Sequence, residues 1–497
     1  MNTLPNVRIC STTLWRKIPL FTRGQISKEI VFFSAKQVGG MKMKKKLLSV
    51  VLSVAMIATV LAGCGGSGAS TAESTGAGEN AAATAAGTAE EGSSAASANV
   101  STEGVKITVL NTKSEIQTQW EEAAAQYKEL TGVDVEVSVT VGDSPSQDIT
   151  KRYASGEVPT IFMGDIQDII MLDEYALDLS NEDWAKDGGS DYGCNYNGRL
   201  IGFPFCIEAR GLMYNKTAIE AATGETFDPT SIKSLDDLTA LLDKLVAGGM
   251  ETPVALNMED WSLGGHYLTQ VYEEQDGTLE GAAAFIESLK AGNEDLKSNA
   301  RWNSLMDTFD VLMKYNMNAG DPLAADYNNN AVSLAEGDIA FWFNGNWAWA
   351  EMSDFAVEGS EYGIMPVAQP DSSNGAVDKL AGGASKYCMI DTKYNSEAQQ
   401  QAAKDFLNWL VYDEKGQDFL VNQCSLVPAF SNISLEVTNP MGLSVQNYAN
   451  EGNLIPGYPE YPGDHWKEMG AEMQKYLGGQ ETRDQLADNI AAYWKAQ

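Results

Sequence analysis

Strand patterns and helix patterns alternate along this chain from position 105 onward, and few fold classes show such alternation. Val105–Leu110 is rich in β-branched residues and predicts a strand, and apolar residues between positions 116 and 130 recur at helical spacings of three and four. Further strands are predicted at Val133–Val139 and Thr160–Met163, with a helix at about 147–154 between them. Strands separated by helices are typical of βαβ units, so we expect an α/β fold with a mostly parallel sheet.

The same alternation continues through the rest of the chain. A strand pair is predicted at Arg199–Phe205 and Gly211–Asn215, and Ser234 is placed to cap a helix at Leu235–Val246. Other helices are predicted at about 267–274, 302–315, 396–411 and 483–495, and other strands at Asp338–Phe343 and Tyr362–Pro366. The roughly 400 residues after position 100 exceed what one core encloses, so we expect two α/β lobes.

A basic and then apolar segment precedes this body. The chain carries 34 Lys+Arg and 68 Asp+Glu, a formal net charge of -34, yet residues 1–63 hold ten Lys or Arg and one acid. Lysines at 42–46 precede the apolar run Leu47–Ala62, which is short for a helix that must cross about 30 Å of hydrocarbon. This order predicts a secretory signal peptide at residues 41–63. We expect Met41 or Met43 to be the true start and residues 1–40 to be a leader outside the native protein.

The apolar run ends in Leu61-Ala62-Gly63-Cys64, which resembles the bacterial lipoprotein box, whose cysteine is lipidated and becomes the mature N-terminus. Of the 36 residues from Gly65 to Val100, 29 are Gly, Ala, Ser or Thr. Such a stretch cannot bury enough apolar surface to order itself. We therefore expect residues 64–100 to be a lipidated cysteine followed by a flexible linker, with the body anchored to the membrane outside the cytoplasm.

Composition and missing motifs exclude several classes of function. An acidic body opposes binding to nucleic-acid phosphates, which relies on Lys and Arg. The two histidines of the chain, His266 and His465, have no His or Cys partner at ligand spacing, so we expect no metal and no cofactor. Nucleotide-binding glycine loops and the motifs of serine nucleophiles are missing from the sequence.

Four cysteines follow Cys64. In a secreted chain they could form two disulfides, in any of three connectivities, but their apolar sequence context suits buried free thiols equally well. Their disulfide state stays open at this point, and no function is assigned to them. They are Cys194, Cys206, Cys388 and Cys424.

Polar side chains accompany the ends of three predicted strands. Asn111 follows the first strand, Asp165 follows the strand at Thr160–Met163, and Glu208 follows Arg199–Phe205. In open α/β sheets, ligands bind beyond the carboxyl ends of the strands, so these side chains are candidates for a binding site. The alternative is that they serve as helix caps and turn residues.

Tryptophans follow several turn-like stretches. The turn signal Asn344-Gly345-Asn346 places Trp347 at the start of the following helix, where packing in the core is the alternative to ligand stacking. Trp261 and Trp466 also follow turn-like stretches, whereas Trp120 and Trp342 are expected in the core. Indole faces beside carboxylates and amides suit a sugar, because its C–H faces stack on rings and its hydroxyls need donors and acceptors. The same set suits a polyamine through cation–π contacts and charge pairing.

Several ordered stretches carry a family resemblance. These are Tyr196–Pro204 continuing to Glu208 and Leu212–Lys216, Leu334–Ala340 continuing to Asn344–Trp349, Tyr362–Pro366, and the helix that contains Phe406 and Trp409. They resemble the extracellular solute-binding proteins of ABC importers, in particular the maltose and oligosaccharide-binding branch. The resemblance implies the two-lobed, periplasmic-binding-protein-like α/β fold of type II, with a hinge between the lobes and a ligand cleft. Lobe 1 would comprise 101–206 and 387–425, and lobe 2 would comprise 211–375 and 430–497.

The resemblance also implies which residues bind the ligand. Polar contacts near the first strand fall on Asn111 and Lys113, and carboxylates fall on Asp165, on Glu208 near the hinge and on Glu259 in the second lobe. The aromatic platform falls on Trp261, Trp347 and Trp466. Ile166-Gln167-Asp168 lacks the basic residue that the maltose-binding branch has after its third strand, which argues against maltose in particular.

These implications lead us to expect a monomeric, lipid-anchored receptor without enzymatic activity. It would capture a carbohydrate, above all an oligosaccharide, by lobe closure and deliver it to the permease subunits of an ABC transporter. The first alternative is a binding protein of the same fold for a polyamine or another cationic solute. The second is a secreted glycoside hydrolase with Glu208 and Asp165 as its acid and base, which requires carboxyls about 5 to 9.5 Å apart.

Overall fold

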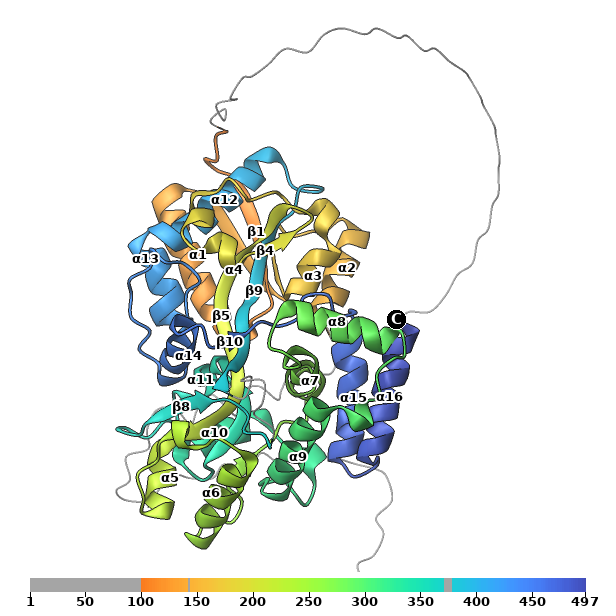
Figure 1. Cartoon of the computed structure of the whole chain (residues 1–497). Helices are drawn as coiled ribbons and strands as arrows, with labels where there is room; N and C mark the ends of the chain where they lie inside the picture. Colours follow the sequence, from red (N-terminus) through yellow and green to blue (C-terminus); the bar gives the residue numbers. More distant parts are fainter. Residues whose placement is uncertain (1–99, 142–143, 371–377) are drawn as a thin grey trace, which may run out of the picture. The chain divides into compact units, whose positions relative to one another are not determined.

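The computed structural model of the chain describes residues 100–141, 144–370 and 378–497, all within the unit Ser94–Gln497 (Figure 1). The predicted leader 1–40, the signal peptide 41–63, the lipidation site Cys64 and all but the last residue of the linker 64–100 lie outside these described residues. Within the described ranges, every helix is too short or too polar to cross a membrane.

One mixed sheet of 10 strands runs through this body. Its main path has the order β2-β1-β3-β9-β5-β7-β6, with β10 beside β9 and with β4 and β8 beside β5. The α/β class is as predicted, but the expectation of a mostly parallel sheet is wrong, because β9 and β5 run antiparallel to β3, to β7 and to each other. The strands are β1 Lys106–Asn111, β2 Asp134–Val139, β3 Ile161–Gly164, β4 Cys194–Tyr196, β5 Arg199–Asn215, β6 Val254–Ala255, β7 Phe341–Gly345, β8 Tyr362–Met365, β9 Leu380–Ile390 and β10 Leu454–Ile455.

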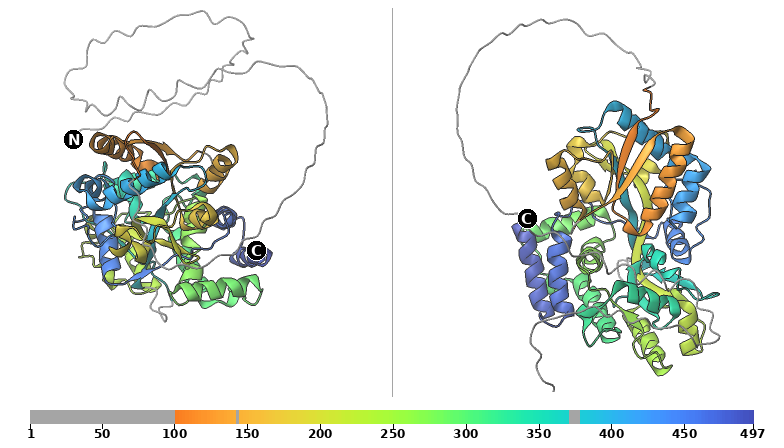
Figure 2. Two further views of the ribbon diagram at one scale, coloured as in Figure 1. Left: turned by 90° about the horizontal axis from the view of Figure 1, so that it is seen from above. Right: turned by 180° about the vertical axis from the view of Figure 1, so that it is seen from behind.

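Helices cover the sheet on both faces (Figures 1 and 2), and many of them begin at a side-chain cap. Ser144, Ser234 and Ser396 each accept a hydrogen bond from a backbone N–H of the first turn, so the predicted cap at Ser234 is confirmed. The α-helices are α1 Gln117–Thr131, α2 Pro145–Ser155, α3 Ile166–Met171, α4 Gly189–Tyr192, α5 Lys216–Thr223, α6 Leu235–Ala247, α7 Gln270–Glu273, α8 Leu279–Lys290, α9 Ala300–Lys314, α10 Tyr327–Glu336, α11 Trp349–Met352, α12 Glu397–Tyr412, α13 Glu414–Asp418, α14 Pro440–Asn450, α15 His465–Leu477 and α16 Arg483–Ala496.

Alternating side chains of the strands build the first lobe, the part around β1, β2 and β3. Ile161 and Met163 pack in the same cluster as Trp120 of α1, whereas Phe162 between them packs on the opposite face with Ile149 of α2. Because successive strand residues point to opposite faces, one short apolar strand binds helices on both sides of the sheet. Trp120 is fully buried, as predicted.

The second lobe, the part around β6, β7 and β8, follows the same rule. Phe341 and Phe343 belong to a cluster that also contains Trp494 of α16, whereas Trp342 points to the other face. Trp342 is fully buried, as predicted. Helices α15 and α16 lie side by side at the edge of this lobe (Figures 1 and 2).

Strand β5 passes from one lobe to the other, which corrects the predicted strand pair. Arg199–Asn215 is one continuous strand of 17 residues. Its first part pairs with β9, its last part pairs with β7 and β8, and Arg210 lies opposite both Ala381 of β9 and Gly345 of β7. Strand β9 runs beside it, between β3 at one end and β10 at the other, so two antiparallel strands connect the lobes (Figure 1).

The pairing of β5 with β9 is irregular next to the point of crossing. The register shifts between Pro204 and Cys206 and again between Cys206 and Ile207. Proline cannot donate to a ladder and is therefore tolerated at such bulges, which also turn neighbouring side chains. A third segment joins the crossing here, because the N–H of Ile207 donates to the carbonyl of Val427 at 2.9 Å.

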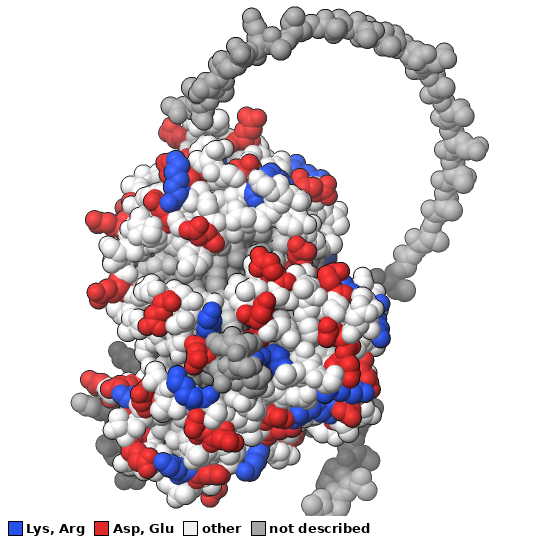
Figure 3. All heavy atoms as spheres, viewed as in Figure 1, with Lys and Arg blue, Asp and Glu red and all other residues white. Residues whose placement is uncertain are grey.

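The surface of the body reflects its acidic composition. Acidic side chains spread over the face in Figure 3, with Lys and Arg interspersed among them. The cysteines that the sequence left open are free and buried: Cys194, Cys206, Cys388 and Cys424.

Candidate functional site

Two lysines and three carboxylates form ion pairs beside the crossing strands. The Nζ of Lys113, just after β1, lies 2.7 Å from Oε1 of Glu208 and 2.8 Å from Oε1 of Glu115. On β9, the Nζ of Lys386 lies 2.6 Å from Oδ1 of Asp165. Lys113 and Glu208 are only 4% and 6% exposed, so each charge depends on its partner for compensation.

Burial and ion pairing act on the pKa values of these groups in opposite directions. Burial alone would raise the pKa of Glu208, but the charge and hydrogen bond of Lys113 and the hydroxyl of Ser385 outweigh it and hold the pKa below its usual value. Burial likewise opposes the charge of Lys113, yet Glu208 and Glu115 hold its pKa well above the usual value. Glu208 and Lys113 are therefore both ionised at neutral pH.

Asn111 fixes the turn that carries Lys113. Its Nδ2 donates to the carbonyl of Lys113 at 2.8 Å, and the N–H of Lys113 donates to its Oδ1 at 2.8 Å. Asn111 itself is fully buried at the end of β1. Glu208 differs from the expectation, because it lies within β5 and not beyond the end of a strand. It reaches the site because β5 itself runs between the lobes.

The three predicted tryptophans surround one histidine. The ring centroid of His266 lies 4.9 Å from that of Trp347, 5.2 Å from that of Trp261 and 6.2 Å from that of Trp466. Trp347 lies in the short helix η9 (Asn346–Ala348), Trp261 begins the π-helix η6 (Trp261–Tyr267), and Trp466 belongs to the first turn of α15. All three indoles are partly exposed. No role was predicted for His266, although its position after Gly264-Gly265 in a tryptophan-bearing loop was a usable signal.

Glycines allow η6 and α15 to approach closely enough to form this group. A Cβ at Gly265 would lie 2.8 Å from the ring of Trp466, and a Cβ at Gly470 would lie 2.6 Å from Asp260. Only glycine fits such contacts, so the indole of Trp466 rests on the backbone next to His266. The π-helical turn itself is a local irregularity of the kind that often occurs at functional sites.

The loop before η6 is anchored in the core of the second lobe. Oδ1 of Asn257 accepts hydrogen bonds from Nε1 of Trp342 at 2.8 Å and from Nδ2 of Asn330 at 3.1 Å. Nδ2 of Asn257 donates to the hydroxyl of Ser262 at 3.2 Å. These bonds hold the start of η6, and with it Trp261, in one place.

Glu259 lies on the same loop, and its carboxylate is hydrogen-bonded to the backbone of the residue before it. One of its carboxylate oxygens accepts a hydrogen bond from the backbone N–H of Met258 at 3.1 Å. Burial, together with the charges of Asp326 and Asp260, raises its pKa above the usual value. The side chain is half-buried, two residues before Trp261.

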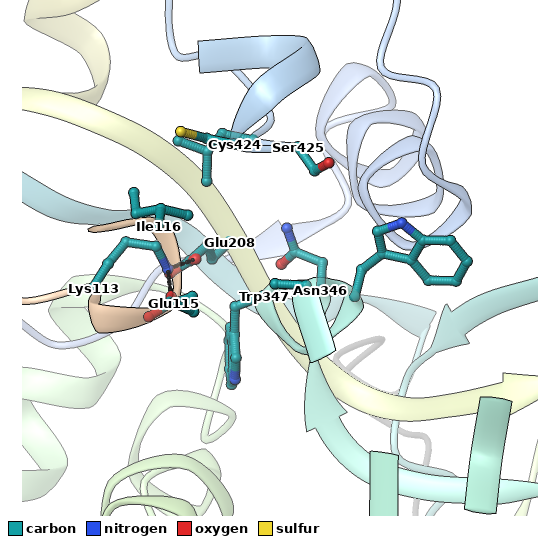
Figure 4. Close-up of a pocket in the computed structure, with 11 residues that line it drawn as sticks. Lys113, Glu115, Ile116, Glu208, Asn346, Trp347, Cys424 and Ser425 are labelled. Atoms are coloured by element: carbon teal, nitrogen blue, oxygen red, sulfur yellow. Dashed lines mark hydrogen bonds and ion pairs between the residues drawn. The ribbon is translucent and has the colours of Figure 1, made fainter. Parts of the chain in front are cut away.

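A small pocket lies where the charged pairs meet Trp347 (Figure 4). In Figure 4, Lys113, Glu115 and Glu208 point toward one another, and Trp347 extends past them from the turn that holds Asn346. The space open to the centre of a water molecule is about 10 Å³, the room of about one water. The pocket walls come from both lobes, and they are close together in this conformation. The lining residues are Lys113, Glu115, Ile116, Glu208, Asn346, Trp347, Trp349, Ala350, Cys424, Ser425 and Leu426.

Residues 122–445 match the model of the family described as bacterial extracellular solute-binding protein, which is more than half of the chain. The chain belongs to this family of binding proteins, which act outside the cytoplasm.

Solved structures of low sequence identity share the fold. RafE in complex with raffinose has a TM-score of 0.64 at 18% identity, over 79% of this chain and 99% of that chain. A sugar transporter protein from Bacillus licheniformis in complex with stachyose has a TM-score of 0.61 at 17% identity, over 79% and 100%. A chitin oligosaccharide binding protein has a TM-score of 0.61 at 18% identity, over 79% and 98%. The predicted two-lobed solute-binding fold is therefore confirmed.

Proposed function

We propose that this protein captures a carbohydrate, above all an oligosaccharide, between its two lobes. The observation that carries the proposal is the convergence of Trp261, Trp347 and Trp466 on His266, next to a wall of buried polar groups. Flat indole faces stack on the C–H faces of a sugar, and the polar wall offers partners to its hydroxyls. The fold neighbours whose names record raffinose, stachyose and chitin oligosaccharides agree with this assignment.

The charges of the site support a neutral ligand over a polyamine. Glu208 and Asp165, two of the acids expected to hold a cation, already have Lys113 and Lys386 as partners at 2.7 and 2.6 Å. The charges also disfavour the glycoside hydrolase alternative. Its general acid would need a raised pKa, whereas the pKa of Glu208 is lowered.

Binding would proceed by closure of the lobes around the ligand. We assign residues 101–206 and 387–425 to lobe 1 and residues 211–375 and 430–497 to lobe 2, with the hinge where β5 and β9 cross. Ligand pockets typically enclose about 300 to 1,000 Å³, so a pocket of about 10 Å³ has no room for a sugar in this conformation. The ligand would enter with the lobes apart, and closure requires that it contact both of them.

Delivery would follow at the membrane. In this proposal a lipid on Cys64 and the linker to residue 100 tether a monomeric body, which passes the sugar unchanged to the permease subunits of an ABC transporter. Mass spectrometry of the protein extracted from membranes should find lipid on Cys64 as the first residue. An unmodified chain that begins at Met1 would contradict this anchor.

A thermal-shift screen tests the proposed ligand class. The panel contains neutral mono- and oligosaccharides together with spermidine, each at low and high salt. A ligand at 100 times its Kd should stabilise the protein by about 2.7 kcal/mol. We expect an oligosaccharide to raise the melting temperature equally at both salt concentrations, because screening acts on charges. Stabilisation by spermidine alone, lost at high salt, would favour the cationic alternative, and glycan fragments in the sample would reveal a hydrolase.

A further inference from the structure

His266 occupies the centre of the aromatic group, where a ligand that stacks on the indoles would meet it. Its ring is tilted by 56° to Trp347 at 4.9 Å and stands at 69° to Trp261 at 5.2 Å. Neither ring covers the imidazole face to face. The histidine therefore adds a polar edge beside the indole faces of Trp261 and Trp347.

A ring nitrogen of His266 lacks a partner among the described residues. Its Nδ1 is buried and makes no hydrogen bond within the ranges that the structure describes. Buried polar atoms are nearly always hydrogen-bonded in native proteins, and the place of this atom among the three candidate tryptophans makes a ligand group a candidate partner. Burial and the charges of Arg210 and Lys386 lower the pKa of His266 well below its usual value, which leaves the ring neutral. A neutral imidazole has one donor and one acceptor nitrogen.

Arg210 connects His266 to the crossing strand β5. Its Nε donates to the backbone carbonyl of His266 at 2.9 Å, and its Nη2 donates to the hydroxyl of Thr269 at 3.0 Å. The same Nη2 also forms an ion pair with Glu273, a residue that is only 2% exposed. The guanidinium thus holds both ends of the η6 to α7 turn against the strand.

Arg210 lies at the point where the pairing of β5 passes from β9 to β7. Arg210 lies opposite Ala381 of β9 on one side and Gly345 of β7 on the other. Gly345 is followed by the η9 turn that carries Trp347, so the strand that anchors His266 through Arg210 also pairs with the strand that leads to Trp347. Arg210 therefore contacts the backbone that carries His266 from a position on β5 that is paired with both β7 and β9.

We propose that His266 is a ligand-binding residue whose imidazole exchanges a hydrogen bond with a sugar hydroxyl between the stacking faces of Trp261 and Trp347, and that Arg210 is its positioning residue. The inference rests on the proposed carbohydrate function and adds the polar contact that selects a hydroxylated ligand over an apolar one. Nδ1 has no hydrogen-bond partner among the described residues, and a sugar hydroxyl would supply one.

Two substitutions at His266 test the contact by calorimetry with the sugar identified in the screen. His266→Phe keeps a ring but removes both nitrogens, and we expect its Kd to rise by about tenfold, the usual effect of one lost hydrogen bond in a buried site. His266→Gln keeps a donor and an acceptor and should recover part of the affinity. Circular dichroism and melting curves check that both variants fold.

Nuclear magnetic resonance of the wild-type protein gives a second readout that needs no variant to fold. The chain has 2 histidines, so selective labelling of the imidazoles yields two sets of signals, and His465 is fully buried in a different ring cluster. Addition of the sugar should shift the ring nitrogens of His266 more than those of His465. A mannitol titration at the same concentration controls for unspecific hydroxyl effects.

The role of Arg210 is tested without leaving a buried charge. The double variant Arg210→Met/Glu273→Gln removes both members of the ion pair, and it should weaken sugar binding. Combined with His266→Phe, it should add little further loss, because both act through the same contact. Fully additive losses would make Arg210 a structural residue only.

The outcomes separate the two proposals. If a sugar binds the wild type but His266→Phe binds it equally well and the imidazole signals do not move, the assignment of His266 is overturned and the carbohydrate function stands. If no sugar of the panel stabilises the wild type, the carbohydrate function falls, and the assignment of His266 falls with it. A tenfold loss in His266→Phe together with a shifted imidazole signal supports both.

Discussion

Replacing Lys113 by Met should destabilise the protein by about 3 kcal/mol, because it leaves the carboxylate of Glu208 buried without its main partner. The side chains of Lys113 and Glu208 are 5% and 6% exposed, and their N–O distance is 2.7 Å. Breaking a buried pair typically costs about 3 to 5 kcal/mol. We expect the lower end of this range, because Ser385 still donates to Glu208 and Lys386 remains as a nearby cation.

The double variant Lys113→Met/Glu208→Gln should recover most of this loss. It removes both charges together and keeps an amide that can accept from Ser385, so its stability should lie within about 1 kcal/mol of the wild type. Urea unfolding at pH 7, with the slopes compared among the proteins, measures all three free energies of unfolding. The exposed pair Lys128–Asp134 is the control: its side chains are 56% and 47% exposed, and Lys128→Met should change stability by less than about 1 kcal/mol.

The pH dependence of the single variant gives an independent check with a defined sign. In the wild type the pKa of Glu208 is lowered, so its stabilising contribution is present above pH 4.5 and is lost as the pH falls through the lowered value. Without Lys113, burial should raise this pKa, and the penalty should shrink as the pH falls and the carboxyl takes up a proton. An unchanged stability of Lys113→Met at pH 7, or equal losses in the single and double variants, would refute the reasoning.

Three further substitutions probe the aromatic groups. Trp347→Ala should weaken sugar binding by about 1 to 3 kcal/mol in calorimetry, and an unchanged Kd would remove this residue from the site. Gly265→Ala would place a methyl 2.8 Å from the Trp466 ring, so it should lower both the melting temperature and the affinity. Gly320→Ala is its control, because nothing lies within 4 Å of that Cβ, and equal effects of the two would contradict the packing argument. Burial lowers the pKa of His465 from 6.5 to about 3, so the unfolded wild type takes up a proton before the folded wild type does as the pH falls. Between pH 8 and pH 5 this should lower the free energy of unfolding of the wild type by about 2 kcal/mol relative to that of His465→Phe. Urea unfolding at both pH values measures this difference, and a constant difference would show that His465 is not the titrating group.

Local sequence patterns predicted much of the fold, but they failed to predict that β5 is one continuous strand. The strand at Val105–Leu110 and the cap at Ser234 follow from residues that lie next to each other in sequence, and both match the structure within a residue or two. The continuity of the strand between Arg199–Phe205 and Gly211–Asn215 does not follow from neighbouring residues in the sequence. The continuous strand depends on pairing with β9 and β7, which lie more than a hundred residues further along the chain. Strand β9 hydrogen-bonds to the earlier part of β5, and β7 hydrogen-bonds to its last part.

The site shows the same division between local and distant causes. Turn signals predicted Trp261, Trp347 and Trp466 outside the regular core, and the family resemblance implied that all three contact the ligand. Their meeting point could not be predicted, because it depends on the contact of Gly265 with Trp466 across two helices that are about two hundred residues apart. His266 was missed because only metal-ligand spacing was considered for it, although Gly264-Gly265 before it and Trp261 in the same loop were a local signal.

Charge pairing explains how so acidic a protein could hold the proposed site for an uncharged ligand. The formal net charge of -34 is a property of the whole chain, and long-range fields of this kind affect solubility and encounter more than local recognition. At the site, Lys113 and Lys386 oppose Glu208 and Asp165 within 2.7 Å, so these four charges are compensated by one another before any ligand arrives. A cation would have to displace a lysine from its carboxylate, whereas a sugar hydroxyl can add a hydrogen bond to an oxygen that is already paired. The carboxylates Glu208 and Asp165, which suited a cationic ligand when only the sequence was considered, therefore favour a neutral ligand once their lysine partners are known.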